Sequence, residues 1–255
     1  MIEQLKELLD YSQHCLVFTG AGISTLSGIP DFRSSNGVFS SQWHGMNVEE
    51  VLSLSCFQKH PELFYAWSKT FVYGLDNYQP NVVHRVVAEL ERREIVSAVY
   101  TQNIDRLHQR AGSMNVKELH GSPSMHHCLK CQAEYDYQTI TPIVQADQVP
   151  KCTKCGGIIK PDVVFYGQDM DMDLIDNAVT DMCKADLLLI LGSSLAVQPA
   201  ASLPMTTYYS GGKIVIVNIQ PTPLDQYATL KFDDLNEVFT ELNNWLATEN
   251  IEKNL

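Results

Sequence analysis

The segment Cys15-Leu-Val-Phe-Thr-Gly-Ala-Gly22 joins a short apolar run directly to a glycine-rich turn. Continuous apolar runs of this length are typical of strands covered on both faces, and the glycines permit a tight turn at the strand end. Between such runs lie helical patterns, one of them capped by Asn81. The alternation predicts an α/β fold with a parallel sheet and helices on both sides. The expected strands are residues 15–19, 96–100, 163–166, 187–191 and 214–217, and the expected helices are residues 82–90, about 174–183 and about 235–246.

Two stretches interrupt this alternation. Residues 40–79 are helical and aromatic, and residues 122–160 carry four cysteines. We expect both to pack beside the sheet and to form a second, smaller domain. The predicted larger, Rossmann-like domain comprises residues 1–37, 81–121 and 161–255, and the predicted insertions comprise residues 38–80 and 122–160.

The cysteine spacing predicts a metal site. Cys128-x2-Cys131 and Cys152-x2-Cys155 each offer two thiolates from a tight turn, as in zinc sites. Four thiolates leave no open coordination position, so the zinc should be structural. His126 and His127 adjoin the first ligand, but the complete set of four cysteines argues against their use. Zinc rather than disulfides indicates a reducing compartment, and we expect a cytoplasmic protein.

Composition narrows the class of partner. The chain has 255 residues and a net charge of −12, which argues against a nucleic-acid surface and suits a basic partner such as a lysine-bearing protein segment. The first residues show no apolar run of signal-peptide type, and the longest apolar runs are too short to cross a bilayer. We therefore expect neither nucleic acid nor membrane as a partner.

The turn at Gly20-Ala21-Gly22 resembles a dinucleotide-binding turn, although Thr25 stands where a third glycine would be. No acidic residue occurs at the distance expected for ribose binding. By itself the turn is either a nucleotide site or a plain strand–helix connection. The loop Gly28-Ile-Pro-Asp-Phe-Arg-Ser34 favours the first, because a phenylalanine between an acid and a base in a loop is more typical of function than of packing.

Seven motifs in order resemble the sirtuins, a family of NAD-dependent protein lysine deacylases, in their compact bacterial and archaeal form. These motifs cover nearly the whole chain and are Gly20-Ala-Gly-Ile-Ser24, Gly28-Ile-Pro-Asp-Phe-Arg33, Thr101-Gln-Asn-Ile-Asp105, Leu119-His-Gly121, the four cysteines, Gly192-Ser-Ser-Leu195 and Ile216-Val-Asn218. The resemblance implies cleavage of nicotinamide from NAD and transfer of the acyl group of lysine to ADP-ribose. His120 would act as general base on a ribose hydroxyl, a role that suits imidazole.

The resemblance also implies the remaining site residues. Asn103 and Asp105 would join His120 in catalysis, with Asp105 and the backbone of Ile104 holding the nicotinamide carboxamide and Phe32 shielding the ribose carbon. The implied NAD contacts are Gly20, Ala21, Gly22, Ser24, Thr25, Asp31, Phe32, Arg33, Gln102, Asn103, Ile104, Asp105, His120, Gly192, Ser193, Ser194, Asn218 and Leu235. The implied contacts to an acyl-lysine peptide are Val163, Val164, Phe165, Tyr166, Leu195 and Val197.

Other interpretations remain open at this point. His120 is alternatively a satisfied buried histidine, and Asp105 alternatively caps the helix that follows it. The chain could also be a mono-ADP-ribosyltransferase that uses the same NAD site, or a zinc protein that only senses NAD.

The residues at positions 65 and 68 bear on which acyl groups the protein would remove. Sirtuins that remove acidic acyl groups resemble this chain at Tyr65 but carry an arginine where Ser68 stands. Without that cation, acidic acyl groups should be poor substrates. Tyr166 and Gln168 also replace a usual Phe and Glu, which weakens any inherited preference for basic flanking residues.

Overall fold

The computed structural model describes residues 1–32, 37–38 and 42–252. Internal contacts divide the chain into two compact units. The larger unit comprises Met1–Ile29, Gln79–Leu119 and Asp171–Leu255, and the smaller comprises Pro30–Tyr78 and His120–Met170. The smaller unit thus includes residues 30–32 and 120–121, which the sequence pattern had placed in the larger domain. It also includes residues 161–170 of that predicted domain. The reason is aromatic packing, because the ring of Phe165 lies 5.2 Å from that of Phe57 and 4.8 Å from that of Phe64.

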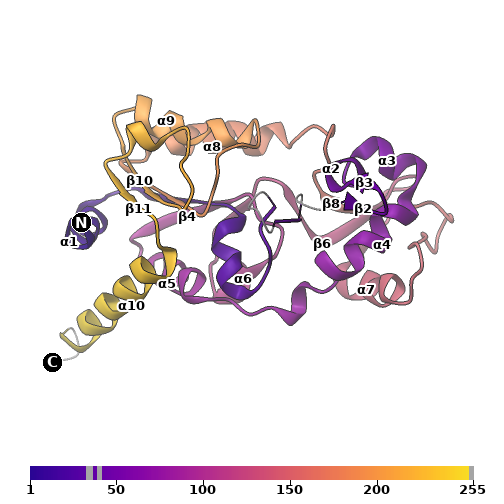
Figure 1. Ribbon diagram of the computed structural model, residues 1–255, viewed down its shortest axis with the longest axis horizontal. Coiled ribbons are helices and arrows are strands. Elements are labelled where there is room, and N and C mark those ends of the chain that lie inside the picture. The colour runs from indigo at the N-terminus through magenta and orange to yellow at the C-terminus, as the bar shows by residue number, and fades with distance from the viewer. Residues whose placement is uncertain (33–36, 39–41, 253–255) are drawn as a thin grey trace. The chain divides into compact units, whose positions relative to one another are not determined.

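The larger unit contains a six-stranded parallel sheet with the order β11-β10-β9-β1-β4-β5, as the α/β prediction required (Figure 1). Its strands are β1 (Cys15–Thr19), β4 (Val96–Thr101), β5 (Val116–Glu118), β9 (Leu187–Leu191), β10 (Lys213–Val217) and β11 (Leu230–Phe232). Every residue of β1 and β9 is buried, which explains their uninterrupted apolar sequences.

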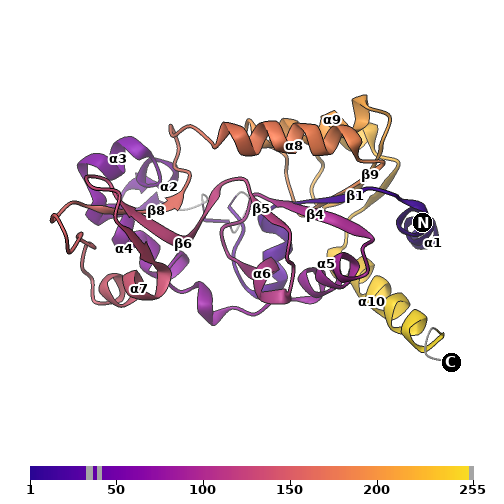
Figure 2. The same cartoon turned by 180° about the vertical axis from the view of Figure 1, so that it is seen from behind.

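Helices cover both faces of this sheet (Figures 1 and 2). On one face, α1 (Ile2–Tyr11), α5 (Val82–Arg92) and α10 (Leu235–Glu252) bury their apolar sides in one core with the strands. On the other lie α8 (Met172–Lys184) and α9 (Pro204–Tyr209). The connections contain α6 (Leu107–Ala111) and the short 3₁₀ helices η1 (Ala21–Ser27), η4 (Ala200–Ser202) and η5 (Asp225–Tyr227).

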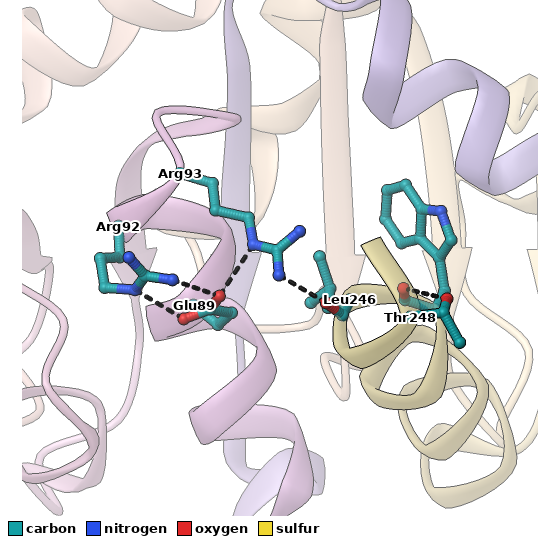
Figure 3. A network of polar contacts seen from close by, with 6 residues as sticks. Glu89, Arg92, Arg93, Leu246 and Thr248 are labelled. Atoms are coloured by element: carbon teal, nitrogen blue, oxygen red, sulfur yellow. Dashed lines mark hydrogen bonds and ion pairs between the residues drawn. The ribbon is translucent and has the colours of Figure 1, made fainter. Parts of the chain in front are cut away.

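A polar clamp joins the end of α5 to α10 (Figure 3). Arg93 donates from Nε to Glu89 Oε1 at 2.8 Å and from Nη2 to the carbonyl of Leu246 at 2.6 Å. Arg92 donates two further hydrogen bonds to the Glu89 carboxylate. The hydrogen bond from Arg92 is the main reason that the pKa of Glu89 falls to about 2. The clamp therefore ties the last turns of α10 to the layer that covers the sheet.

The smaller unit has a three-stranded antiparallel sheet of order β7-β6-β8, a two-stranded hairpin and four α-helices within the described residues. Its elements are β2 (Gln42–Trp43), β3 (Met46–Asn47), α2 (Val48–Val51), α3 (Leu54–Lys59), α4 (Pro61–Phe71), η3 (Leu75–Asn77), β6 (Gly121–Cys128), β7 (Glu134–Asp136), α7 (Tyr137–Gln145) and β8 (Ile159–Val163). The core of this unit is largely aromatic, as in the packing of Phe57 with Phe64.

One predicted strand was wrong. Residues 163–166 were expected as a strand of the parallel sheet, but the strand in this region is β8, which ends at Val163 and pairs antiparallel with β6. The sequence of β8, Ile-Lys-Pro-Asp-Val, did not predict a strand, because it has neither the apolar run nor the alternation that is typical of one. Beyond β8, Tyr166 forms an isolated parallel β-bridge with Ser53. Within the residues that the structure covers, no helix is long and apolar enough to cross a bilayer.

Candidate active site and metal centre

The order of the strands creates a switch point at the carboxyl ends of β1 and β9. From β1 the chain proceeds outward through β4 to β5, and later returns to the other side of β1 through β9 and β10. Ligands of open parallel sheets bind where the connections diverge in this way. The motifs Gly20-Ala21-Gly22 and Gly192-Ser193-Ser194 follow these two strands and therefore lie at the switch point.

The glycines at this edge pack against each other. The amide of Gly22 donates to the carbonyl of Gly192 at 2.8 Å, and a Cβ at Gly22 would lie 2.7 Å from that oxygen. A Cβ at Gly20 would lie 2.8 Å from it, and Gly192 itself has φ +60°. Only glycine fits such contacts. The turn thus brings two strand-end loops together, in addition to any approach that it allows to a phosphate.

Ser24, Asn103 and Asp105 form a buried polar cluster at the same edge. Ser24 Oγ donates to Asp105 Oδ2 at 2.6 Å and lies 3.2 Å from Asn103 Nδ2, which also donates to the carbonyl of Gly20 at 3.0 Å. Their exposed fractions are 2%, 8% and 6%. Two segments that are far apart in sequence are therefore joined through three side chains of the predicted site.

Asp105 precedes Arg106, the N-cap residue of the helix that follows, and its side chain accepts a hydrogen bond from the first amide of that helix. The amide of Leu107, at the start of α6, donates to Asp105 Oδ1 at 2.9 Å. Burial raises the pKa of Asp105, and the hydrogen bonds from Ser24 and Leu107 oppose that change. Each carboxylate oxygen has two lone pairs, so Asp105 can still accept a hydrogen bond from an amide.

A second set of predicted contacts follows β9. Ser193 Oγ donates to Gln102 Oε1 at 2.8 Å and accepts from the amide of Leu195 at 3.2 Å. Leu195 has φ +53°, which is uncommon for a leucine and often marks a functional loop.

The other predicted contacts are placed as follows. Thr25 donates to the carbonyl of Gly22 at 2.8 Å, and Asn218 follows β10 and donates to the carbonyl of Gln220 at 2.7 Å. Leu235 is the first residue of α10. Ala21 lies in η1, whereas Ile104, Ser194 and Val197 lie in loops of the larger unit. Asp31 and Phe32 are half-buried residues of the smaller unit, and Arg33 lies outside the described residues.

His120 belongs to the smaller unit and lies beside the predicted peptide segment. Its carbonyl accepts a hydrogen bond from the amide of Val164 at 2.8 Å. The next residue, Gly121, has φ +72°, and a Cβ there would lie 1.9 Å from the carbonyl oxygen of Asp162. The glycine of the His-Gly motif is thus required by the pairing of β6 with β8. The unit brings His120 together with Val163 and Val164.

The rest of the peptide segment is held by the junction of α2 and α3 and by aromatic packing. The amide of Tyr166 donates to the carbonyl of Leu52 at 3.0 Å, and the amide of Leu54 donates back to the carbonyl of Tyr166 at 2.9 Å. Phe165 is buried, and Lys160 Nζ lies 4.0 Å from the centre of its ring. Lys160 Nζ also donates to the carbonyls of Pro161 and Val163 at 2.9 and 2.7 Å.

The four predicted metal ligands converge. The Sγ atoms of Cys128, Cys131, Cys152 and Cys155 all lie within 4.8 Å of one another. Three of the separations are 3.4–3.5 Å. A tetrahedral zinc with Zn–S bonds of ~2.3 Å needs separations of ~3.8 Å, so the thiols fit this ion. The nearby imidazole of His126 is instead hydrogen-bonded to Tyr73 Oη at 2.8 Å.

Two residues that support the thiols were missed by sequence reasoning. Tyr135 Oη donates to Cys152 Sγ at 3.2 Å, and this hydrogen bond is the main reason that the pKa of Cys152 falls to about 6. A Cβ at Gly157 would lie 2.8 Å from Cys128 Sγ. The Gly156-Gly157 pair directly after Cys155 was a signal in the sequence, whereas Tyr135 had none.

The predicted acyl-selectivity residues both lie inside the smaller unit. Tyr65 Oη donates to the carbonyl of Ile159 at 2.6 Å, and Ser68 has no exposed surface. The hydroxyl of Tyr65 is therefore engaged with β8.

Comparison with known proteins identifies the family. A family model described as "Sir2 family" matches residues 20–199. A Thermotoga maritima protein named NAD-dependent protein deacetylase is 41% identical over 232 residues, which cover 91% of this chain and 92% of the relative. An Archaeoglobus fulgidus protein named NAD-dependent protein deacylase 2 is 42% identical over 231 residues, with coverages of 90% and 89%.

Solved structures give the same result. One described as "Sir2-p53 peptide-NAD+" is 39% identical, has a TM-score of 0.87 and covers 98% of this chain and 99% of its own. Another, described as Sir2Tm bound to a propionylated peptide, is 38% identical, with a TM-score of 0.85 and the same coverages. The resemblance inferred from the seven motifs is confirmed, and this chain belongs to the Sir2 family.

Proposed function

We propose that this chain is an NAD-dependent protein lysine deacetylase that transfers the acyl group to ADP-ribose and releases nicotinamide and O-acyl-ADP-ribose. The observation that carries the proposal is the buried cluster of Ser24, Asn103 and Asp105 at the switch point of the sheet. The names of the relatives and the NAD and peptide in the similar structures support the same activity.

The chemistry of the side chains at the sheet edge fits NAD. Bound NAD supplies a ribose whose bond to nicotinamide can be broken. Asp105 would accept a hydrogen bond from the carboxamide of nicotinamide, with Ser24 holding the carboxylate in place. Asn103 would orient the ribose or an ordered water. Ser193, Ser194 and Asn218 offer hydroxyl and amide groups at strand ends, where phosphates and the adenosine ribose bind.

His120 would be the general base. A histidine at this point would take the proton from a ribose hydroxyl, which imidazole does well near neutral pH. The hydrogen bond between the carbonyl of His120 and the amide of Val164 fixes the base relative to the segment proposed to hold acyl-lysine. Phe32 would keep water from the reacting carbon.

The substrate would be an acyl-lysine in an extended peptide that adds to Val163–Tyr166 and Leu195–Val197 as an extra strand. Apolar acyl groups are favoured over acidic ones. The smaller unit does contain the cation Lys160, but its Nζ is bonded to the carbonyls of Pro161 and Val163. A carboxylate there would lose its hydration and would meet an ammonium group that already donates two hydrogen bonds.

One structural zinc would be held by Cys128, Cys131, Cys152 and Cys155. We also propose a cytoplasmic location, because four thiols that must stay reduced to bind zinc suit a reducing compartment.

The test is the dependence of nicotinamide release on the peptide. The zinc-loaded chain is incubated with NAD, alone and with acetyl-lysine or unmodified lysine peptides. Deacetylation predicts release only with the acetylated peptide. Equal release with both peptides would instead favour ADP-ribosyl transfer, and release with neither would leave an NAD-sensing protein.

A further inference from the structure

A row of buried hydrogen-bonding groups lies directly next to Asn103 in the larger unit. The amide of Asn103 donates to Thr101 Oγ1 at 3.0 Å, and Thr19 Oγ1 donates to the same oxygen at 2.7 Å. Thr19 Oγ1 also lies 3.2 Å from Nε2 of His108. Thr19, Thr101 and His108 are at most 2% exposed. The row connects the ends of β1 and β4 to α6 without contact with solvent.

The direction of these hydrogen bonds fixes the tautomer of His108. The hydroxyl of Thr19 has a single hydrogen, which it donates to Thr101, so toward His108 it can only accept. Nε2 of His108 must therefore carry a proton. In the neutral ring Nδ1 is then a bare acceptor, and it has no hydrogen-bond partner among the residues that the structure describes.

The ring of His84 lies next to that of His108, and its tautomer can be assigned in the same way. Its Nδ1 accepts a hydrogen bond from the amide of Asn81 at 3.4 Å, so its Nε2 carries the proton. That Nε2 also lacks a partner within the described part of the chain. The two ring centroids are 5.0 Å apart. The two neighbouring rings therefore have the same tautomer.

We propose that His108 is a positioning residue for the reaction: as a neutral imidazole protonated on Nε2, it holds Thr19 and Thr101 and through them the main chain of Asn103. The inference rests on the proposed function, because the row affects activity only through the role of Asn103. The side chain of Asn103 bonds Gly20 and Ser24, so a shift of its main chain would disturb the whole cluster.

The alternative is that His108 merely fills space. The two explanations predict opposite rankings for the activity of two variants. His108→Phe keeps a flat ring of similar volume but removes the donor to Thr19. His108→Gln packs less well but retains an N–H at the distance of Nε2. A packing role predicts that Phe is tolerated better than Gln, and a positioning role predicts the reverse.

The experiment measures nicotinamide release from NAD and acetyl-lysine peptide for the zinc-loaded full chain. We expect His108→Phe to keep the far-UV circular dichroism and the KM for peptide, but to lower kcat roughly 10- to 100-fold, the order of loss that follows a displaced catalytic group. His108→Gln should recover most of kcat. The control His14→Phe changes a histidine that pairs with Asp181 outside the row and should leave kcat unchanged.

Nitrogen-15 spectra of the histidine side chains provide a readout besides activity, and both His84 and His108 should show the Nε2–H tautomer. An Nδ1–H tautomer at His108, or a folded His108→Phe with the kcat of the parent, would overturn the inference while leaving the proposed function intact. If the Phe variant does not fold, His108→Asn replaces it, because the shorter amide of asparagine cannot reach Thr19. A kcat of this Asn variant equal to that of the Gln variant would then overturn the inference. A parent chain that makes no deacetylated product would refute the proposed function, and this role with it.

Discussion

The two units of this chain are stabilised in different ways. The larger unit surrounds a sheet of fully buried strands, and three helices bury their apolar sides in a single core. The smaller unit has short strands, an aromatic cluster and four thiols arranged for a metal. Four thiolates that bind one zinc would add a second source of stability to this aromatic core. The comparison teaches that the proposed NAD-binding cluster belongs to a unit held by its own core, whereas His120 belongs to a unit in which four thiols are placed to bind zinc.

The largest expected effect follows from removing zinc. Cys128→Ser should abolish the one zinc per chain, unfold the smaller unit and eliminate deacetylation, because a structural zinc contributes about 10–16 kcal/mol in small zinc-binding peptides. Hydrogen exchange should rise in residues 121–163 and change little in β1 and β9. Cys183→Ser is the matched control, since Cys183 is an exposed cysteine outside the metal site. Unchanged zinc content and thermal stability in Cys128→Ser would show that the metal site is wrong.

The next effect concerns the base in the smaller unit. His120→Ala should retain most of the NAD affinity, because most of the implied NAD contacts lie in the larger unit, while deacetylation falls roughly 10²–10⁴-fold. Rates from steady-state kinetics and NAD affinity from calorimetry check both parts. His60→Ala is the control, because His60 is a half-exposed histidine of the same unit that pairs only with Glu62 in the contacts of the described residues. Deacetylation within about tenfold of the parent would remove His120 from this role.

Acid should weaken the larger unit through its two buried histidines. Burial lowers the pKa of His84 to about 4, and the charge of Arg85 adds to the effect. Burial also lowers the pKa of His108 to about 3, with a smaller contribution from His84. The unfolded chain takes up protons near pH 6.5 and the folded unit does not, so the free energy of unfolding falls as the pH drops from about 6.5 to about 3. At pH 5 the free energy of unfolding should be lower by about 2 kcal/mol for each histidine.

Hydrogen exchange in β9 reports this loss separately from any acid release of zinc in the smaller unit. His108→Gln should flatten the pH dependence. An equal dependence in the parent and this variant would contradict the assignment to His108.

The smallest effect is at Tyr65. Tyr65→Phe should cost about 1 kcal/mol in the free energy of unfolding, because one buried hydrogen bond to Ile159 is lost. If that hydroxyl serves only β8, the ratio of desuccinylation to deacetylation should stay low and unchanged. Urea denaturation and peptide assays measure the two quantities. A fall in desuccinylation alone would show that Tyr65 meets the acyl group after all.

The sequence predicted features set by local pattern and missed those set by packing. The strands at 15–19 and 187–191 were placed at their bounds because both are uninterrupted apolar runs. β8 was misplaced because its polar residues carry no strand pattern. The spacing of the cysteines predicted their convergence, but no pattern could reveal that Tyr135 donates to Cys152.

The spacing of the motifs also predicted which residues occupy a position of the family, but not which way their side chains point. The alignment placed Ser68 where an arginine would meet an acidic acyl group, but Ser68 has no exposed surface. In Ser68→Arg the new guanidinium would be buried in the smaller unit and should unfold it.

The most direct test of the proposed activity is the mass of the products made from NAD and an acetyl-lysine peptide by the zinc-loaded chain. We expect nicotinamide, free-lysine peptide and O-acetyl-ADP-ribose in equal amounts, with the acetyl label of the peptide recovered on ADP-ribose. Free acetate together with unmodified ADP-ribose from the start of the reaction, or a peptide that has gained ADP-ribose and kept its acetyl group, would contradict the account.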